Sequence, residues 1–216
     1  MNGYPAGKKD FLLVTVTSLI FGLFLLPILE NIRPAFWEFN SRNVMLVIAG
    51  FLVFGNFALW VGSLIGRKYS WAWQFAKYGA VGSMAAATNF GILNLLSLLT
   101  GAFSGVLIIV FNTAAFAVTV TNAYFWHKFW SFGQNSKPQL IQFSRYLAVA
   151  VASAVIDSLI VYFFTTFIEA PGGLSPAVWE NIGKAIAVFP VVIFNFLGYK
   201  FFVFHPGMAD DKSEPI

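Results

Sequence analysis

Long uninterrupted runs of apolar residues, separated by short polar stretches, dominate the pattern of the chain. A helix needs about 20 apolar residues to cross the roughly 30 Å hydrocarbon layer of a bilayer. Six runs qualify, at residues 11–29, 43–65, 78–99, 105–125, 147–167 and 185–202. Apolar residues run continuously rather than at every second position, which is typical of helices and not of strands. The pattern therefore predicts an all-α membrane protein with six transmembrane helices.

Composition agrees with this pattern. Charged residues make up only 10% of the 216 residues and hydrophobic residues 58%, whereas a soluble domain carries about 25% charged residues. The net charge of +4 is scattered in ones and twos between apolar runs, which excludes nucleic acid as a partner. With no cysteine and only two distant histidines, we expect no metal site and no cofactor. No catalytic constellation is visible, so we expect that the protein is not an enzyme.

The lysine and arginine residues predict the orientation, because they concentrate on the cytoplasmic side of membrane proteins. A cytoplasmic N-terminus leaves only Arg33, Arg42 and Lys184 outside and puts the other ten basic residues inside. Both termini are then cytoplasmic, and the protein is a multi-pass protein of the inner, or cytoplasmic, membrane. The polar end, residues 205–216, is expected to be a disordered cytoplasmic tail.

An internal repeat divides the chain. Residues 74–81 return as residues 142–149, and residues 128–132 match residues 200–204. Two copies of one helical hairpin are therefore predicted, and they run parallel because each enters from the basic side. The expected domains are an added two-helix membrane hairpin at residues 1–70, a four-helix membrane domain at 71–204, and the tail.

Polar residues inside the predicted spans are the first candidate site. Asn89 and Asp157 occupy equivalent positions, 12 residues beyond Lys77 and Arg145, which is about 18 Å along a helix and near the bilayer midplane. An intramembrane acid is costly and marks a functional site by default. The alternative for Asp157 is a neutral acid that packs through a hydrogen bond. The predicted midplane polar pathway consists of Asn89, Asp157, Asn122 and Asn195.

A set of basic residues at the cytoplasmic boundary is the second candidate site. Its members are Lys77, Arg145, Lys128 and Lys200, which form two matched pairs in the repeats. They set the topology in the simplest interpretation, and attract anionic lipid. In the more specific interpretation they form a ring that binds a lipid-borne phosphate.

The repeated segments resemble the GtrA-like family of small membrane proteins over about residues 74–204. The resemblance is carried by residues 142–149 together with Asp157, and by residues 195–204, which run from Asn195 to an aromatic-x-Phe ending. The first copy departs from the family pattern, with Asn89 where an acid is usual and Lys77 where arginine is common. The leading hairpin lies outside the usual four spans.

The resemblance implies a role in the synthesis of cell-surface polysaccharide or glycolipid. It implies translocation, or flipping, of a polyprenyl-phosphate-linked sugar as the first hypothesis. A non-catalytic membrane anchor for a partner glycosyltransferase is the second, and it would use the loop at residues 126–145. The intramembrane acid leaves a small proton-coupled exporter as a third. The expected partners are the lipid-linked sugar, membrane lipid and a glycosyltransferase, and a homo-oligomer stays open.

Overall fold

The computed structural model describes residues 6–34, 37–101, 106–169, 171–172 and 176–205. The chain divides into two compact units, residues 1–133 and 134–216. All regular structure in the described residues is helical, which confirms the predicted all-α class. Of the expected tail, only His205 belongs to the described residues; residues 206–216 lie outside them.

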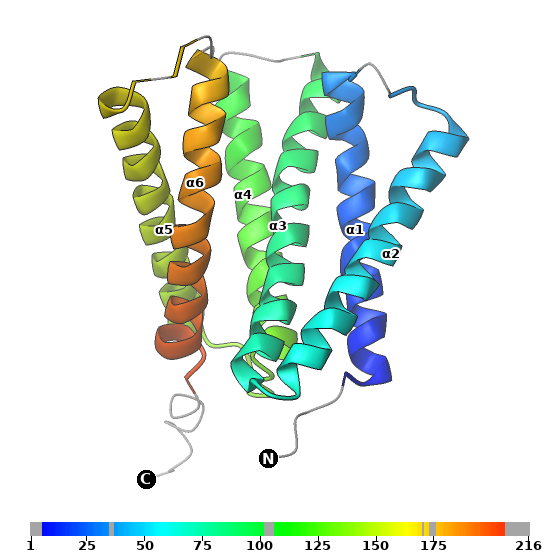
Figure 1. Ribbon diagram of the computed structural model, residues 1–216, viewed down its shortest axis with the longest axis vertical. Coiled ribbons are helices and arrows are strands. Elements are labelled where there is room, and N and C mark those ends of the chain that lie inside the picture. The colour runs from blue at the N-terminus through cyan, green and yellow to red at the C-terminus, as the bar shows by residue number, and fades with distance from the viewer. Residues whose placement is uncertain (1–5, 35–36, 102–105, 170, 173–175, 206–216) are drawn as a thin grey trace. The chain divides into compact units, whose positions relative to one another are not determined.

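The described residues of unit 1 form four long helices that each overlap one predicted apolar run (Figure 1). They are α1 (Lys8–Ile32), α2 (Ser41–Gly66), α3 (Ser70–Thr100) and α4 (Val106–Trp126), and α4 continues into a short π-helix, η1 (His127–Ser131). The Asn40 side chain begins α2 by accepting a 2.9 Å hydrogen bond from the Asn43 backbone N–H. Gly101 ends α3 in the left-handed conformation, with φ at 69°.

Helix α3 is the centre of unit 1, because it contacts α1, α2, α4 and η1. Small residues permit these contacts, as they do between helices in membranes. Gly62 of α2 lies so close to α3 that an added Cβ would be 2.5 Å from the Ala76 Cβ. On the α1 side, a Cβ at Gly91 would lie 2.6 Å from the Phe24 Cβ. The α3 helix therefore has little room for larger side chains at these crossings.

Polar side chains also link α1 to its neighbouring helices in the unit. The Asn31 amide donates a 2.6 Å hydrogen bond to Asn94, which links α1 to α3. The Asn56 amide donates to the Thr15 hydroxyl at 3.0 Å, which links α1 to α2. Helices α1 and α2 are thus packed into the same compact unit as α3 and α4. The domain boundary expected at residue 70 stays a prediction.

Unit 2 is a single helical hairpin. It consists of α5 (Leu140–Phe167), α6 (Pro176–Leu197) and a π-helix, η2 (Gly198–Val203), which continues α6. Gly198 lies against α5, since an added Cβ would be 2.8 Å from a methyl group of Val149. The two predicted apolar runs, 147–167 and 185–202, both lie within these helices.

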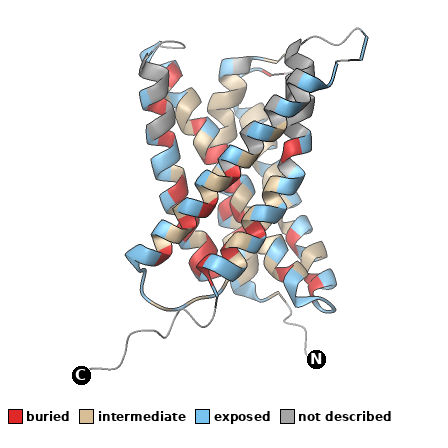
Figure 2. Cartoon of the chain, turned by 90° about the vertical axis from the view of Figure 1, so that its left-hand side faces the viewer, coloured by how far each residue is buried: buried red, intermediate tan, exposed pale blue. Residues whose placement is uncertain are grey.

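Exposed residues occur along the helices (Figure 2), and many of them are large and apolar. Among the described residues, α1, α2 and α3 are long and apolar enough to cross a membrane, and shorter apolar stretches lie at Leu140–Ser153 and Phe189–Val203. Exposed phenylalanine and leucine side chains on such helices are expected where the surrounding medium is lipid.

Candidate functional site

The first candidate basic residue, Lys77, takes part in an ion pair. The Lys77 ammonium of α3 lies 2.9 Å from a carboxylate oxygen of Asp10 in the first turn of α1, and the two side chains are only 15% and 17% exposed. The same oxygen accepts a 3.0 Å hydrogen bond from the Trp130 indole N–H, and the other carboxylate oxygen accepts the Gly7 backbone N–H. Lys77 also lies over the Trp73 ring, 4.6 Å from its centre. Asp10 therefore supplies Lys77 with a counter-ion from within the chain.

Replacing Asp10 with asparagine should destabilise unit 1 by about 1–3 kcal/mol, between the values for exposed and buried ion pairs. Asparagine keeps an oxygen that can accept from Trp130 but removes the charge that faces Lys77. The unfolding midpoint of the purified protein in detergent measures the effect. Glu30→Gln is the control, because it removes an ion pair with Arg33 whose side chain is 75% exposed, and should cost less than about 1 kcal/mol. Equal losses in both variants would contradict a stabilising role for Asp10.

Lys128, the second basic residue of unit 1, is fully buried at 0% exposure within η1. Desolvation lowers the pKa of its ammonium, because burial disfavours the charged form. A phosphate group could contact this ammonium only after a local rearrangement. The neighbouring Phe129 is exposed at the surface.

The polar ends of the two hairpins share a local structure. In unit 1 the Tyr78 ring stacks on His127 with centres 5.0 Å apart, and η1 ends with a hydrogen bond from the Phe132 N–H to the His127 carbonyl. In unit 2 the Tyr146 ring stacks on Tyr199 at 4.4 Å, and η2 ends with a bond from Phe204 to the Tyr199 carbonyl. In each hairpin, the tyrosine follows the candidate basic residue directly in the sequence. π-Helical turns are rare and are often found at functional sites.

The basic residues of unit 2 lie against aromatic rings. The Arg145 guanidinium is 5.7 Å from the centre of the Phe202 ring, and the Lys200 ammonium is 5.4 Å from that of Phe201. Gln142, one turn before Arg145 and buried, donates hydrogen bonds to the Val203 carbonyl of η2 and to Gln134. This contact gives the repeated glutamine a structural role, since it satisfies a carbonyl at the end of a helix.

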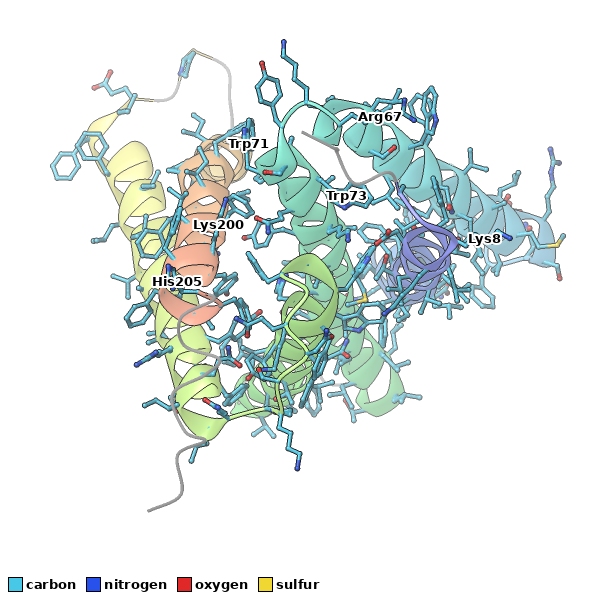
Figure 3. All side chains as sticks on the ribbon, turned by 90° about the horizontal axis from the view of Figure 1, so that it is seen from below. Lys8, Arg67, Trp71, Trp73, Lys200 and His205 are labelled. Carbon is cyan, nitrogen blue, oxygen red and sulfur yellow. The ribbon has the colours of Figure 1, made fainter. Side chains whose placement is uncertain are left out.

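Figure 3 views the chain from below and labels Lys8, Arg67, Trp71 and Trp73 in unit 1, and Lys200 and His205 in unit 2. The structure thus places Lys77 and Lys128 in unit 1, and Arg145 and Lys200 in unit 2. The ring of all four residues stays a prediction.

The candidate pathway residues divide between the same units. Asn89 and Asn122 are half-buried on α3 and α4. In unit 2, the Ser153 hydroxyl of α5 donates a short hydrogen bond to the Asn195 amide oxygen of α6. The register of α5 places Asp157 one helical turn beyond Ser153, while the Asp157 side chain lies outside the described residues. The Ser153–Asn195 pair is a polar contact that the sequence analysis did not predict, because Ser153 was not among the candidate residues.

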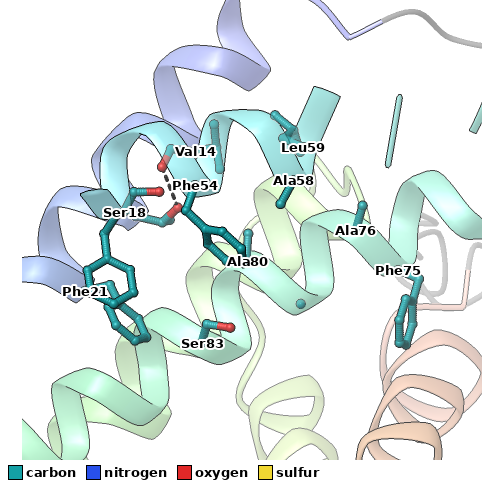
Figure 4. A pocket seen from close by; sticks show the side chains of 14 residues that line it. Val14, Ser18, Phe21, Phe54, Ala58, Leu59, Phe75, Ala76, Ala80 and Ser83 are labelled. Carbon is teal, nitrogen blue, oxygen red and sulfur yellow. Dashed lines mark hydrogen bonds between the residues drawn. The ribbon is translucent and has the colours of Figure 1, made fainter. Parts of the chain in front are cut away.

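A cavity of about 350 Å³ lies between α1, α2 and α3 (Figure 4). Phenylalanine side chains and small residues form most of its lining. The small ones on α2 and α3 are Gly55, Ala58, Ala76, Gly79 and Ala80. Its volume falls at the lower end of the range for ligand pockets, about 300–1,000 Å³. No sequence pattern pointed to this cavity, because it depends on how three helices pack.

The architecture of apolar helices with few charges defines the protein as an all-helical, multi-pass membrane protein. Across the described residues, no cluster of three or more potential metal-ligating side chains occurs. Residues 77–204 match the family model for the GtrA/DPMS transmembrane domain, and the protein belongs to this family, as the resemblance predicted. No curated protein and no solved structure matches the chain.

Proposed function

We propose that the protein translocates a polyprenyl-phosphate-linked sugar across the membrane during the synthesis of a cell-surface polysaccharide or glycolipid. The GtrA/DPMS family supports a role in glycolipid or polysaccharide synthesis. The observation that carries the more specific proposal is the Ser153–Asn195 hydrogen bond inside an apolar hairpin, one turn from Asp157. Polar groups there offer hydrogen bonds to sugar hydroxyls where lipid offers none.

In this proposal the helices form six spans, and α3–α4 and α5–α6 are two copies of one hairpin. The shared tyrosine stacking and the π-helical ends support the duplication. A basic residue precedes the stacked tyrosine in each copy, Lys77 in one and Arg145 in the other. We assign to these residues, with Lys200, the attraction of the lipid phosphate, and Lys128 joins them only if a local rearrangement of η1 exposes its ammonium. The protein itself carries out no catalytic step.

Transport by the purified protein tests the proposal. The full chain is reconstituted in vesicles with a polyprenyl-phosphate-linked hexose that carries a fluorescent label, and the label in the outer leaflet is quenched by an impermeant reductant. We expect exchange between leaflets to be faster than in vesicles without protein. An unchanged exchange rate would contradict translocation. If a glycosyltransferase nevertheless co-purified with the chain, membrane anchoring would replace translocation as the proposed function.

Binding of the carrier tests the basic residues. The double variant Lys77→Gln/Arg145→Gln should bind polyprenyl phosphate more weakly, and the binding of the unaltered chain should fall with added salt, because the attraction is electrostatic. Lys137→Gln is a control. Lys137 is exposed, and it lies in the segment that connects η1 to α5. Equal binding by a folded double variant and the unaltered chain would leave Lys77 and Arg145 as topology signals only.

A cysteine at position 137 should be labelled by an impermeant thiol reagent only after the cells are opened, because the segment between η1 and α5 is proposed to be cytoplasmic. The chain has no cysteine of its own, so single reporters have no background. Glu38→Cys, exposed between α1 and α2, should instead be labelled in intact cells. The reverse pattern would invert the proposed topology.

A further inference from the structure

The cavity of unit 1 lies between three helices that are long and apolar enough to span a membrane. Its lining comes from residues 14–21 of α1, 51–59 of α2 and 75–83 of α3. At 1.5 Å per residue, the stretch on each helix covers about 10–12 Å. Most of this lining precedes residue 77, where the family match begins, so the cavity belongs largely to the leading hairpin.

The chemistry of the lining selects a hydrocarbon occupant. Four phenylalanines contribute to it, and the polar side chains are Thr17, Ser18 and Ser83. The Thr17 hydroxyl already donates a 3.0 Å hydrogen bond to the Val14 carbonyl. An apolar cavity of this kind offers water too few hydrogen bonds, because a buried water needs two to four polar partners.

The cavity is accessible from the side of the helices. Phe54 and Phe75 line it and are nevertheless 66% and 37% exposed, so their rings lie at its opening. At Gly79, which also lines the cavity, an added Cβ would meet no atom within 4 Å. A chain from the surrounding bilayer can therefore enter without displacing a helix.

Basic residues lie at the end of the helices nearest the cavity. Lys8 and Lys9 begin α1, and Arg67 and Lys68 lie between α2 and α3; all four are exposed. The cavity lining starts six residues after Lys8 on α1 and ends eight residues before Arg67 on α2, which are distances of about 9 and 12 Å. An anionic head group at this end and a chain in the cavity are thus within reach of one lipid molecule.

We propose that this cavity binds one acyl chain of an anionic phospholipid, whose head group lies among Lys8, Lys9, Arg67 and Lys68. Bulk phospholipid is the occupant by mass action, because it surrounds the helices at far higher concentration than any carrier lipid. Each basic residue near an anionic membrane surface adds about 1 kcal/mol of attraction. The site is separate from the sugar pathway, and its occupancy does not depend on translocation.

Photo-crosslinking tests the site on the full chain. The protein is reconstituted in phosphatidylcholine vesicles with a trace of phosphatidylglycerol that carries a diazirine on one acyl chain, and the cross-linked residues are mapped by mass spectrometry. We expect cross-links to concentrate in residues 14–21, 51–59 and 75–83. An even distribution over exposed apolar residues of all helices would overturn the proposal, and this map needs no variant.

Two matched glycine variants make the test specific. Gly79→Leu should fill the cavity and reduce these cross-links about tenfold, the equivalent of about 1.4 kcal/mol in affinity. Gly82→Leu is the control, because an added Cβ at Gly82 also meets no atom within 4 Å and Gly82 is absent from the lining. Unchanged labelling of a folded Gly79→Leu chain would overturn the site.

Two further cross-linking experiments test which head group and which type of lipid chain the cavity binds. The same photoreactive chain on phosphatidylcholine should label the cavity less, and equal labelling would overturn the anionic assignment. An equimolar amount of unlabelled polyprenyl phosphate should leave the labelling unchanged. Its loss under that condition would assign the cavity to the carrier lipid and overturn the acyl-chain proposal.

Discussion

A chain that carries Asp157→Asn should fold, reach the membrane and translocate the labelled lipid-linked hexose at most about one-tenth as fast, which corresponds to about 1.4 kcal/mol in the barrier. Asparagine keeps the volume and most of the hydrogen-bonding capacity but cannot carry a negative charge. An acid near the bilayer midplane costs about 2.5–3.5 kcal/mol on insertion scales. We therefore expect transport to use the charge of Asp157 or its proton.

The position of Asp157 on α5 sharpens this experiment. Ser153, one turn earlier, is held by Asn195, so Ser153→Ala is a useful comparison that removes a neighbouring polar group without changing charge. If Asp157 only packs as a neutral acid, the asparagine variant should transport at the rate of the unaltered chain between pH 5 and 9. That outcome would contradict its place in the pathway, provided the variant is folded and equally abundant in the vesicles.

Gly91→Ala should lower the unfolding midpoint of the protein by several degrees, even though alanine is the better helix former by about 0.8–1.0 kcal/mol in aqueous peptides. The added Cβ would lie 2.6 Å from the Phe24 Cβ, and Phe24 contributes backbone as well as side-chain atoms to this contact. The helices α1 and α3 must then move apart. Overpacking of this kind costs about 1–3 kcal/mol and occasionally more.

The matched control is Gly82→Ala. Gly82 precedes Gly91 on the same helix, and an added Cβ there meets no atom within 4 Å. It should leave the midpoint unchanged or raise it slightly. The two variants are compared by thermal unfolding in detergent, which is monitored as the loss of monodisperse protein. Equal stability of both variants would show that α1 and α3 do not depend on the close approach at Gly91.

The helices could be predicted from sequence because each long apolar run overlaps one along nearly its whole length. Their beginnings could not, since α3 begins at Ser70 and α5 at Leu140, several residues before the apolar runs at 78 and 147. Trp71, Trp73 and Gln142 are aromatic or polar, so hydropathy alone excludes them. A helix nevertheless continues past the hydrocarbon layer, because its backbone hydrogen bonds do not depend on the surrounding medium.

The contacts of the candidate residues were less predictable. Lys77 was expected from the repeat, but its partner Asp10 belongs to a helix with no counterpart in the repeat. Trp130, which was not a candidate residue, donates to the same carboxylate. Pairings between distant segments follow from how helices cross, and no local pattern records that. Asp157 and Asn89 were found by sequence alone, and their roles stay predictions.

The packing of the leading hairpin bears on how the chain can be divided. A fragment cut at residue 77, where the family match begins, would keep Lys77 and lose its counter-ion Asp10. It would also lose Asn31, the donor to Asn94, and Phe24, which lies against Gly91. The excised fragment would expose a face of α3 shaped for another helix. We therefore expect the matched segment, residues 77–204, to be less stable by itself than within the full chain.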